Sequence, residues 1–301
     1  MTVQMTPDFI EVFRSFDRRQ CDDRAFMLAA VNIPSEVDVD SASYVVSVPY
    51  GQAAFANHHL WQYEQELRRR PRIVLQPARV YPHAWVGSAL YVALLVMVAM
   101  AVVRGWWRPD TFAIGTLDAA AVQSGQWWRA ITALTLHVDI VHLLMNLGSG
   151  TAIGYLASRQ IGAGHAWLLT VLGAGVANLV EALFSMPGHQ SVGASTAVFA
   201  ALGLLATHSW RTRLIASHPT LRRLAPLIAG AALLGLMGTA GEGTDVLAHL
   251  FGFVAGCVLG MVVALPNVAV RMNSLPQWVS GALTLALVAG AWSLALMSAV
   301  A

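Results

Sequence analysis

The chain has 301 residues, of which 56% are hydrophobic and only 11% charged, and its mean hydropathy is +0.59. This composition excludes an ordinary soluble globular protein and indicates a polytopic membrane protein. The formal net charge of +2 gives no indication of a nucleic-acid partner. Cys21 and Cys257 fall in different predicted environments, which argues against a disulfide between them.

Residues 1–75 are polar and mixed, which predicts a small soluble α+β domain. The pattern fits a βαββα module with a helix over 18–30, two short strands over 37–48 and a second helix over 52–70. We expect Phe26, Met27 and Ala30 to form the apolar face of the first helix. Nothing in this domain indicates catalysis. The adjacent pair His58–His59 points in two directions, which favours a surface position over a metal site.

Seven apolar segments follow, each near the length that a bilayer requires. We expect them at about 84–103, 138–157, 164–185, 193–209, 224–240, 245–266 and 278–299. One set of loops holds most of the arginines, namely Arg68 to Arg79, Arg159, Arg211, Arg213, Arg222, Arg223 and Arg271. The positive-inside rule then predicts a cytoplasmic N-terminus and, after seven spans, a C-terminus on the outside.

This topology brings polar residues of three separate spans to one depth. His142 and Asn146 lie in the first half of the second span, while Ser195 and His249 begin the fourth and sixth. All three spans run from outside to inside, and a helix rises about 1.5 Å per residue. Each side chain is therefore expected within roughly 10 Å of the outer end of its helix.

These residue types predict nucleophilic catalysis. Serine needs a base to take its proton, and His249 is the partner expected at matching depth. His142 and Asn146 are four residues apart on one helix face and can donate hydrogen bonds to a developing oxyanion, together with the backbone N–H of Ser195. No aspartate inside a span is available to orient His249, so a Ser–His dyad is expected.

Small residues surround the predicted dyad. Gly193 precedes Ser195 in the segment SVGASTAVFAALGLLA, which covers residues 191–206. Gly252 and Gly256 follow His249 at small-xxx-small spacing, which allows the fourth and sixth spans to approach closely. The G-x-S-x-G elbow of soluble hydrolases is not matched, because Ala197 replaces its last glycine.

Taken together, these ordered motifs resemble the rhomboid intramembrane serine proteases over about residues 84–266. The motifs are Gly125-Gln126-Trp127-Trp128-Arg129, His137-x4-His142-x3-Asn146, Gly193-Ala194-Ser195 and Ala248-His249-x2-Gly252-x3-Gly256. The resemblance implies an all-α rhomboid-like six-helix core with Ser195 as nucleophile and His249 as base. It also implies an oxyanion hole of His142, Asn146 and the Ser195 amide, a membrane-embedded loop that contains Trp128 and Arg129, and a structural His137. Residues 267–301 would add a linker and a seventh span.

Three positions depart from the family pattern. Thr196 replaces a usual glycine, Phe199 replaces a tyrosine that packs against the histidine, and Ser158 replaces an acidic residue that anchors the first loop. Phe199 keeps the ability to stack on His249, and Arg129 is expected to find other partners than a carboxylate.

The resemblance implies a protein of the bacterial inner membrane whose substrates are single-span membrane proteins, cut where the helix unwinds near the outer face of the lipid bilayer. The sequence requires no cofactor. A catalytically inactive relative that only binds membrane proteins is the alternative. A metal site of His137, Asp139 and His142 is disfavoured, because helix positions five apart diverge by about 140°. A transporter is disfavoured too, because no inverted repeat or charge pair inside the spans is visible. The substrates, the oligomeric state and the roles of residues 1–75 and of the seventh span stay open.

Overall fold

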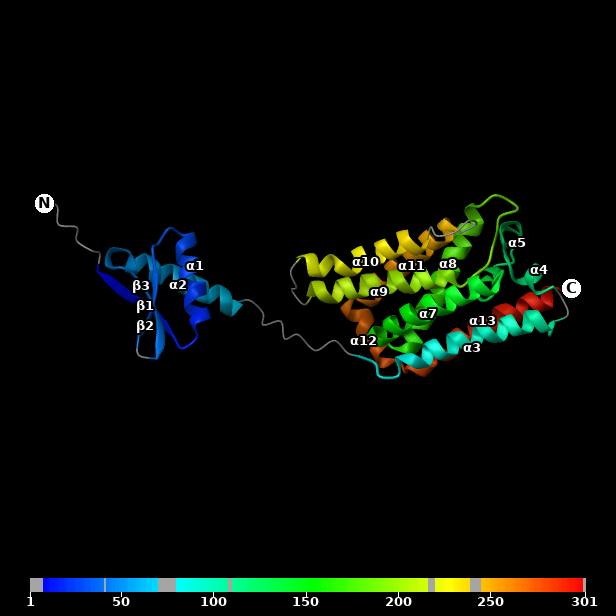
Figure 1. Cartoon of the computed structure of the whole chain (residues 1–301), viewed down its shortest axis with the longest axis horizontal. Coiled ribbons are helices and arrows are strands. Elements are labelled where there is room, and N and C mark those ends of the chain that lie inside the picture. The colour runs from blue at the N-terminus through cyan, green and yellow to red at the C-terminus, as the bar shows by residue number, and fades with distance from the viewer. Residues whose placement is uncertain are drawn as a thin grey trace. The chain divides into compact units, whose positions relative to one another are not determined.

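A computed structural model describes residues 8–40, 42–69, 80–107, 110–215, 220–238 and 245–299 (Figure 1). The chain divides into two compact units, Met1–Val74 and Leu75–Ala301, which are described separately. Among the positions used to predict topology, Arg70, Arg72 and Arg79 lie outside the described residues.

The N-terminal unit is a three-stranded sheet with two helices, in the predicted βαββα order. Its elements are β1 (Phe9–Ser15), α1 (Arg18–Ala30), β2 (Glu36–Asp40), β3 (Ser43–Pro49) and α2 (Ala53–Arg69). The sheet order is β1-β3-β2, and both pairings are antiparallel. Asp17 caps α1 by accepting a hydrogen bond from the Arg19 amide. The predicted α+β character of this unit is thus confirmed.

The face that α1 buries differs from the prediction. Cys21 and Leu28 are fully buried, and they pack with Val46 of β3 and Leu60 of α2. Phe26 is 79% exposed, and Ala30 is exposed as well. At 100° per residue Phe26 lies about 200° from Leu28, so both cannot face the sheet. The prediction of Phe26 and Ala30 as core residues was therefore wrong.

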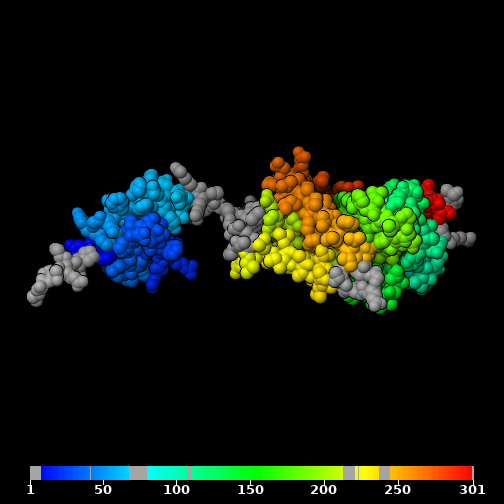
Figure 2. Space-filling model, turned by 90° about the horizontal axis from the view of Figure 1, so that it is seen from above, coloured from blue at the N-terminus to red at the C-terminus, as the bar shows by residue number. Residues whose placement is uncertain are grey.

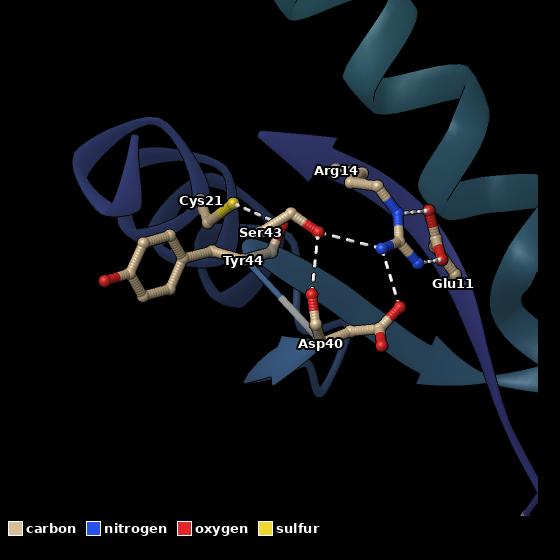
Figure 3. A network of polar contacts seen from close by, with 6 residues as sticks. All are labelled: Glu11, Arg14, Cys21, Asp40, Ser43 and Tyr44. Carbon is tan, nitrogen blue, oxygen red and sulfur yellow. Dashed lines mark hydrogen bonds and ion pairs between the residues drawn. The ribbon is translucent and has the colours of Figure 1, made fainter. Parts of the chain in front are cut away.

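A polar network joins β1 to the hairpin of β2 and β3 (Figure 3). The Arg14 guanidinium donates to Asp40 at 2.7 Å, to Ser43 at 2.8 Å and to Glu11. Its hydrogen bonds hold the pKa of Glu11 below the ordinary value. Because the three charged side chains are solvent-exposed, the network orients the strand ends and contributes little to stability.

In its described residues, the second unit contains seven long helices that match the seven predicted apolar segments. They are α3 (Ala84–Arg104), α7 (Ile140–Ile161), α8 (Ala163–Phe184), α9 (Ser195–Ile215), α10 (Thr220–Gly238), α11 (Val246–Val263) and α13 (Gln277–Ser298). Within the described residues, five of them are long and apolar enough to cross a membrane: α3, α7, α8, α11 and α13. The protein is therefore an integral membrane protein with a polytopic helical fold.

The outward surface of these helices is apolar, as contact with lipid requires. Leu236 of α10 is 74% exposed and Val258 of α11 is 57% exposed. In Figure 2 the two helices form adjoining parts of one surface, coloured yellow and orange.

Short elements fill the connection between α3 and α7. They are α4 (Thr111–Gly115), β4 (Leu117–Asp118), α5 (Ala119–Gln123), α6 (Arg129–Thr132) and a 3-10 turn (Ala133–Thr135). β4 pairs with β5 (Gln190–Ser191), which couples this connection to the segment that precedes α9. One further short helix, α12 (Pro266–Ser274), joins α11 to α13.

Helices α9 and α11 are in direct backbone contact at Gly252 and Gly256 of α11. A methyl group on Gly252 would lie 2.5 Å from the Thr196 carbonyl oxygen, and one on Gly256 would lie 2.0 Å from that of Ala200. These glycines therefore let the two backbones approach directly. The close contact predicted from the small-xxx-small spacing is confirmed.

Candidate active site

The predicted site residues lie in the first two turns of three helices. His142 and Asn146 belong to α7, Ser195 is the first residue of α9, and His249 is the fourth residue of α11. Asp139 and Asp245 cap α7 and α11 by accepting hydrogen bonds from backbone amides. The N-terminal ends of three helices thus carry all four side chains.

Gly193 brings Ser195 and His142 to one point. Its φ of +135° is a conformation that favours glycine, and its amide donates to the Ala133 carbonyl at 3.0 Å. A Cβ at this position would lie 2.8 Å from His142 Nε2 and 3.5 Å from Ser195 Oγ. The Ser195 hydroxyl and the His142 imidazole therefore both lie close to the Cα of Gly193, which carries no side chain.

His249 faces the same side of α9 as Ser195. Its ring lies 4.5 Å from that of Phe199, measured between centroids, with a tilt of 39°. Phe199 is four residues after Ser195, so both point from one face of α9. His249 is only 6% exposed, whereas Ser195 is partly exposed. Phe199 keeps the stacking contact expected of it.

Asn146 is buried and held by its own helix. Its Nδ2 donates to the His142 carbonyl at 3.1 Å, and its backbone carbonyl accepts from the Tyr91 hydroxyl at 2.8 Å. A carboxamide nitrogen carries two hydrogens, so the bond to His142 uses one of two donors.

His137 supports the backbone before Ser195. Its Nε2 accepts a hydrogen bond from the Ala194 amide at 3.4 Å, and its ring lies edge-on to that of His142 at 5.1 Å. Burial lowers the pKa of His137 to about 4, so the ring stays neutral and keeps its acceptor at neutral pH. This geometry matches the structural role that the family resemblance implies.

Arg129 is held by the connection between α3 and α7. Its guanidinium donates to Gln126 Oε1 at 2.7 Å and to the carbonyls of Thr116 and Ala113 at 2.9 Å each. Arg129 is buried, and Trp128 beside it is partly buried. Ser158 is fully buried, and its hydroxyl has no hydrogen-bond partner within the described ranges. Backbone carbonyls therefore replace the carboxylate that the family pattern would supply.

One polar cluster beside this site was not predicted from the sequence. Glu181, His189 and Asp245 bring their side chains within 4.8 Å of one another. The signal was present in the sequence, because Glu181 is an ionisable residue inside a predicted span. None of the three residues was among the predicted site residues.

Comparison with known proteins agrees with the motifs. A profile of the Rhomboid domain matches residues 124–266. Rhomboid protease GluP of Bacillus subtilis is 28% identical over 182 residues, which are 59% of this chain and 35% of that protein. RHOMBOID-like protein 4 of Arabidopsis thaliana is 34% identical over 150 residues, or 50% of this chain and 37% of the relative.

A third relative is matched over most of its length. The rhomboid family protein YdcA of Bacillus subtilis is 30% identical over 143 residues, which are 47% of this chain and 69% of that protein. The chain thus spans about a third of the first two relatives and about two thirds of the third.

Proposed function

Because this chain belongs to the rhomboid family of intramembrane serine proteases, we propose that it is an active serine endopeptidase that cuts transmembrane segments of membrane proteins. The observation that carries the proposal is the convergence of Ser195 Oγ and His142 Nε2 on Gly193, with His249 stacked on the same face of α9. An inactive membrane-protein binder would not need a nucleophile, a base and oxyanion donors at one depth.

In the proposed reaction, His249 takes the hydroxyl proton of Ser195 while Oγ attacks the carbonyl carbon of the scissile peptide. The protonated imidazole then gives this proton to the leaving nitrogen, which breaks the C–N bond and leaves an acyl-enzyme. Water repeats the sequence on the ester and restores Ser195. The stack on Phe199 supports this role because it fixes the plane of the imidazole.

The negative charge of the tetrahedral intermediate needs donors in place beforehand. His142 Nε2, the second N–H of Asn146 Nδ2 and the backbone N–H of Ser195 are the proposed donors. The last lies at the N-terminus of α9, where the helix dipole favours an anion.

The arginine distribution supports a cytoplasmic N-terminus, an external C-terminus and cleavage near the outer face. A helical substrate hides its scissile carbonyls in hydrogen bonds, so residues that weaken helices should favour cleavage. The substrates proposed are therefore single-span proteins with Gly or Pro near the outer end of the span, in a bacterial inner membrane.

The test is cleavage of a panel of transmembrane substrates by the purified full chain and its variants. Ser195→Ala should abolish cleavage, and His249→Ala should nearly do so, because the hydroxyl then has no base. Asn146→Ala should lower the rate by about 10²–10³-fold, the cost of one oxyanion donor. Ser293→Ala, at an exposed serine of α13, serves as the matched control and should leave the rate unchanged.

A fluorophosphonate probe gives a second readout that needs no substrate. It should label Ser195 in the wild type and label His249→Ala poorly. Cleavage that persists in Ser195→Ala, or labelling of another serine, would refute the assignment. A wild type that neither cuts nor labels would favour the inactive binder.

A further inference from the structure

The cluster of Glu181, His189 and Asp245 draws its side chains from three segments of the membrane unit. Glu181 lies in the last turn of α8, His189 in the turn before β5, and Asp245 at the N-cap of α11. His189 Nε2 lies 3.3 Å from Glu181 Oε1 and 3.3 Å from Asp245 Oδ2. One imidazole nitrogen thus faces two carboxylates.

With both carboxylates ionised and His189 neutral, this cluster would carry an unbalanced negative charge. Glu181 is 1% exposed, and in the part of the chain that the structure describes no N–H or O–H group donates a hydrogen bond to its carboxylate oxygens, which face the carboxyl group of Asp245. A buried carboxylate without hydrogen bonds is strongly disfavoured, and a second carboxylate nearby adds repulsion. A positive charge among the three side chains, either a cation or a proton, must offset it.

The geometry points to a cation. Two ligands of a tetrahedral Zn²⁺, each about 2.1 Å from the metal, lie about 3.4 Å apart. Both distances from His189 Nε2, 3.3 Å to each carboxylate oxygen, match this spacing. We propose that Glu181, His189 and Asp245 bind one Zn²⁺ ion and leave its fourth position open.

The supporting contacts orient the donors for this role. Asp245 Oδ1 accepts from the Ala248 amide at 3.1 Å, which leaves Oδ2 to face the cluster. The His189 carbonyl accepts from the Ala119 amide at 3.1 Å, and the next residue, Gln190, pairs with β4. A hydrogen bond that orients a ligating carboxylate is typical of metal sites, and the backbone contacts hold the segment that carries His189.

Such an ion would join the two chain segments that lead to the proposed dyad. The segment that carries His189 continues through Gly193 to Ser195, and the Asp245 carbonyl accepts from the His249 amide at 3.2 Å. Zinc would fix both segments to the end of α8. The zinc ion would therefore have a structural role beside the active site, without contact to the reacting atoms.

The experiment measures zinc in the full chain, purified in detergent. After treatment with a chelator and removal of the chelator, the wild type is titrated with ZnCl₂, and bound metal is determined by mass spectrometry. We expect one Zn²⁺ per chain and an upward shift of the thermal unfolding midpoint on loading. Glu181→Gln and His189→Gln should each lose the metal and the shift, whereas His83→Ala, which removes an exposed histidine elsewhere in the same unit, should keep both.

The outcomes separate a cation from a proton. A wild type that binds no zinc at any concentration that leaves it folded would overturn the proposal and leave a shared proton as the balancing charge. Zinc retained by both glutamine variants would also overturn it. If the variants do not fold, the wild-type titration decides alone. Neither readout depends on proteolysis, so an inactive protein that binds zinc would refute only the proposed protease function.

Discussion

The direct contact between α9 and α11 gives a quantitative prediction for Gly252→Ala. The added methyl group would lie 2.5 Å from the Thr196 carbonyl oxygen, and this oxygen belongs to the backbone and cannot rotate away. Ordinary contact begins at 3.4 Å, so the two helices must separate locally by about 0.9 Å, the difference between the two distances.

This displacement falls between the proposed nucleophile and base. Thr196 follows Ser195 directly, and Gly252 lies about one turn after His249. A misplacement of about 1 Å costs on the order of 10²-fold in rate, so kcat/KM for a transmembrane substrate should fall about 100-fold. Overpacking should also lower the free energy of unfolding by about 1–3 kcal/mol. Cleavage assays and chemical unfolding in detergent measure the two effects separately.

Gly290→Ala is the matched control. Gly290 lies within α13, and a methyl group on it would meet no atom within 4 Å. This variant should keep full activity and gain up to about 1 kcal/mol from helix propensity. If Gly252→Ala cut substrate at the wild-type rate, the spacing between α9 and α11 would not position the dyad, and the reasoning would fail.

Three further predictions test other parts of the site. The pKa of His137 lies near 4 when folded and at 6.5 ordinarily, so the unfolded chain takes up more protons between these values. The free energy of unfolding should therefore fall as pH is lowered from 6.5 to 4, by at most about 1.4 kcal/mol per pH unit, and His137→Gln should flatten this slope. Thr196→Gly should lower that free energy by about 1 kcal/mol without raising activity, because the Thr196 methyl is buried against Gly252. In a chain without Cys21 and Cys257, Met186→Cys should be labelled from outside and Arg213→Cys from inside; the reverse would contradict the proposed orientation.

The features that sequence predicted best are encoded locally. Seven apolar segments predict seven helices because length and hydropathy are properties of each segment alone. The contact between α9 and α11 followed from the spacing of Gly252 and Gly256, since residues four apart share one face. The buried face of α1 was harder to predict, because its few apolar residues do not form a single stripe. Cys21 and Leu28 are buried, whereas the larger Phe26, on the opposite face, is exposed.

The features that sequence missed depend on contacts between distant segments. His189 stands in a polar turn with no periodicity, and only the fold brings it to Glu181 and Asp245. The pairing of β4 with β5 involves two residues from each strand, too few to show alternation. The oxygen partners of Arg129 were equally hidden, because two of the three are backbone carbonyls, which every sequence contains.

The contacts of α13 also depend on distant segments, and they connect this helix to the candidate site. Its sequence predicts only an apolar span, yet Trp292 donates from Nε1 to Thr135 Oγ1 at 3.0 Å, and both residues are buried. Around this bond Trp292 packs with Ile114, Ile131 and Leu136 from the connection between α3 and α7. Within that connection Leu136 is followed by His137, which accepts a hydrogen bond from the amide of Ala194, the residue before Ser195. Because packed interiors transmit displacement, we expect α13 to stabilise, through these contacts, the segment on which the position of the proposed nucleophile depends.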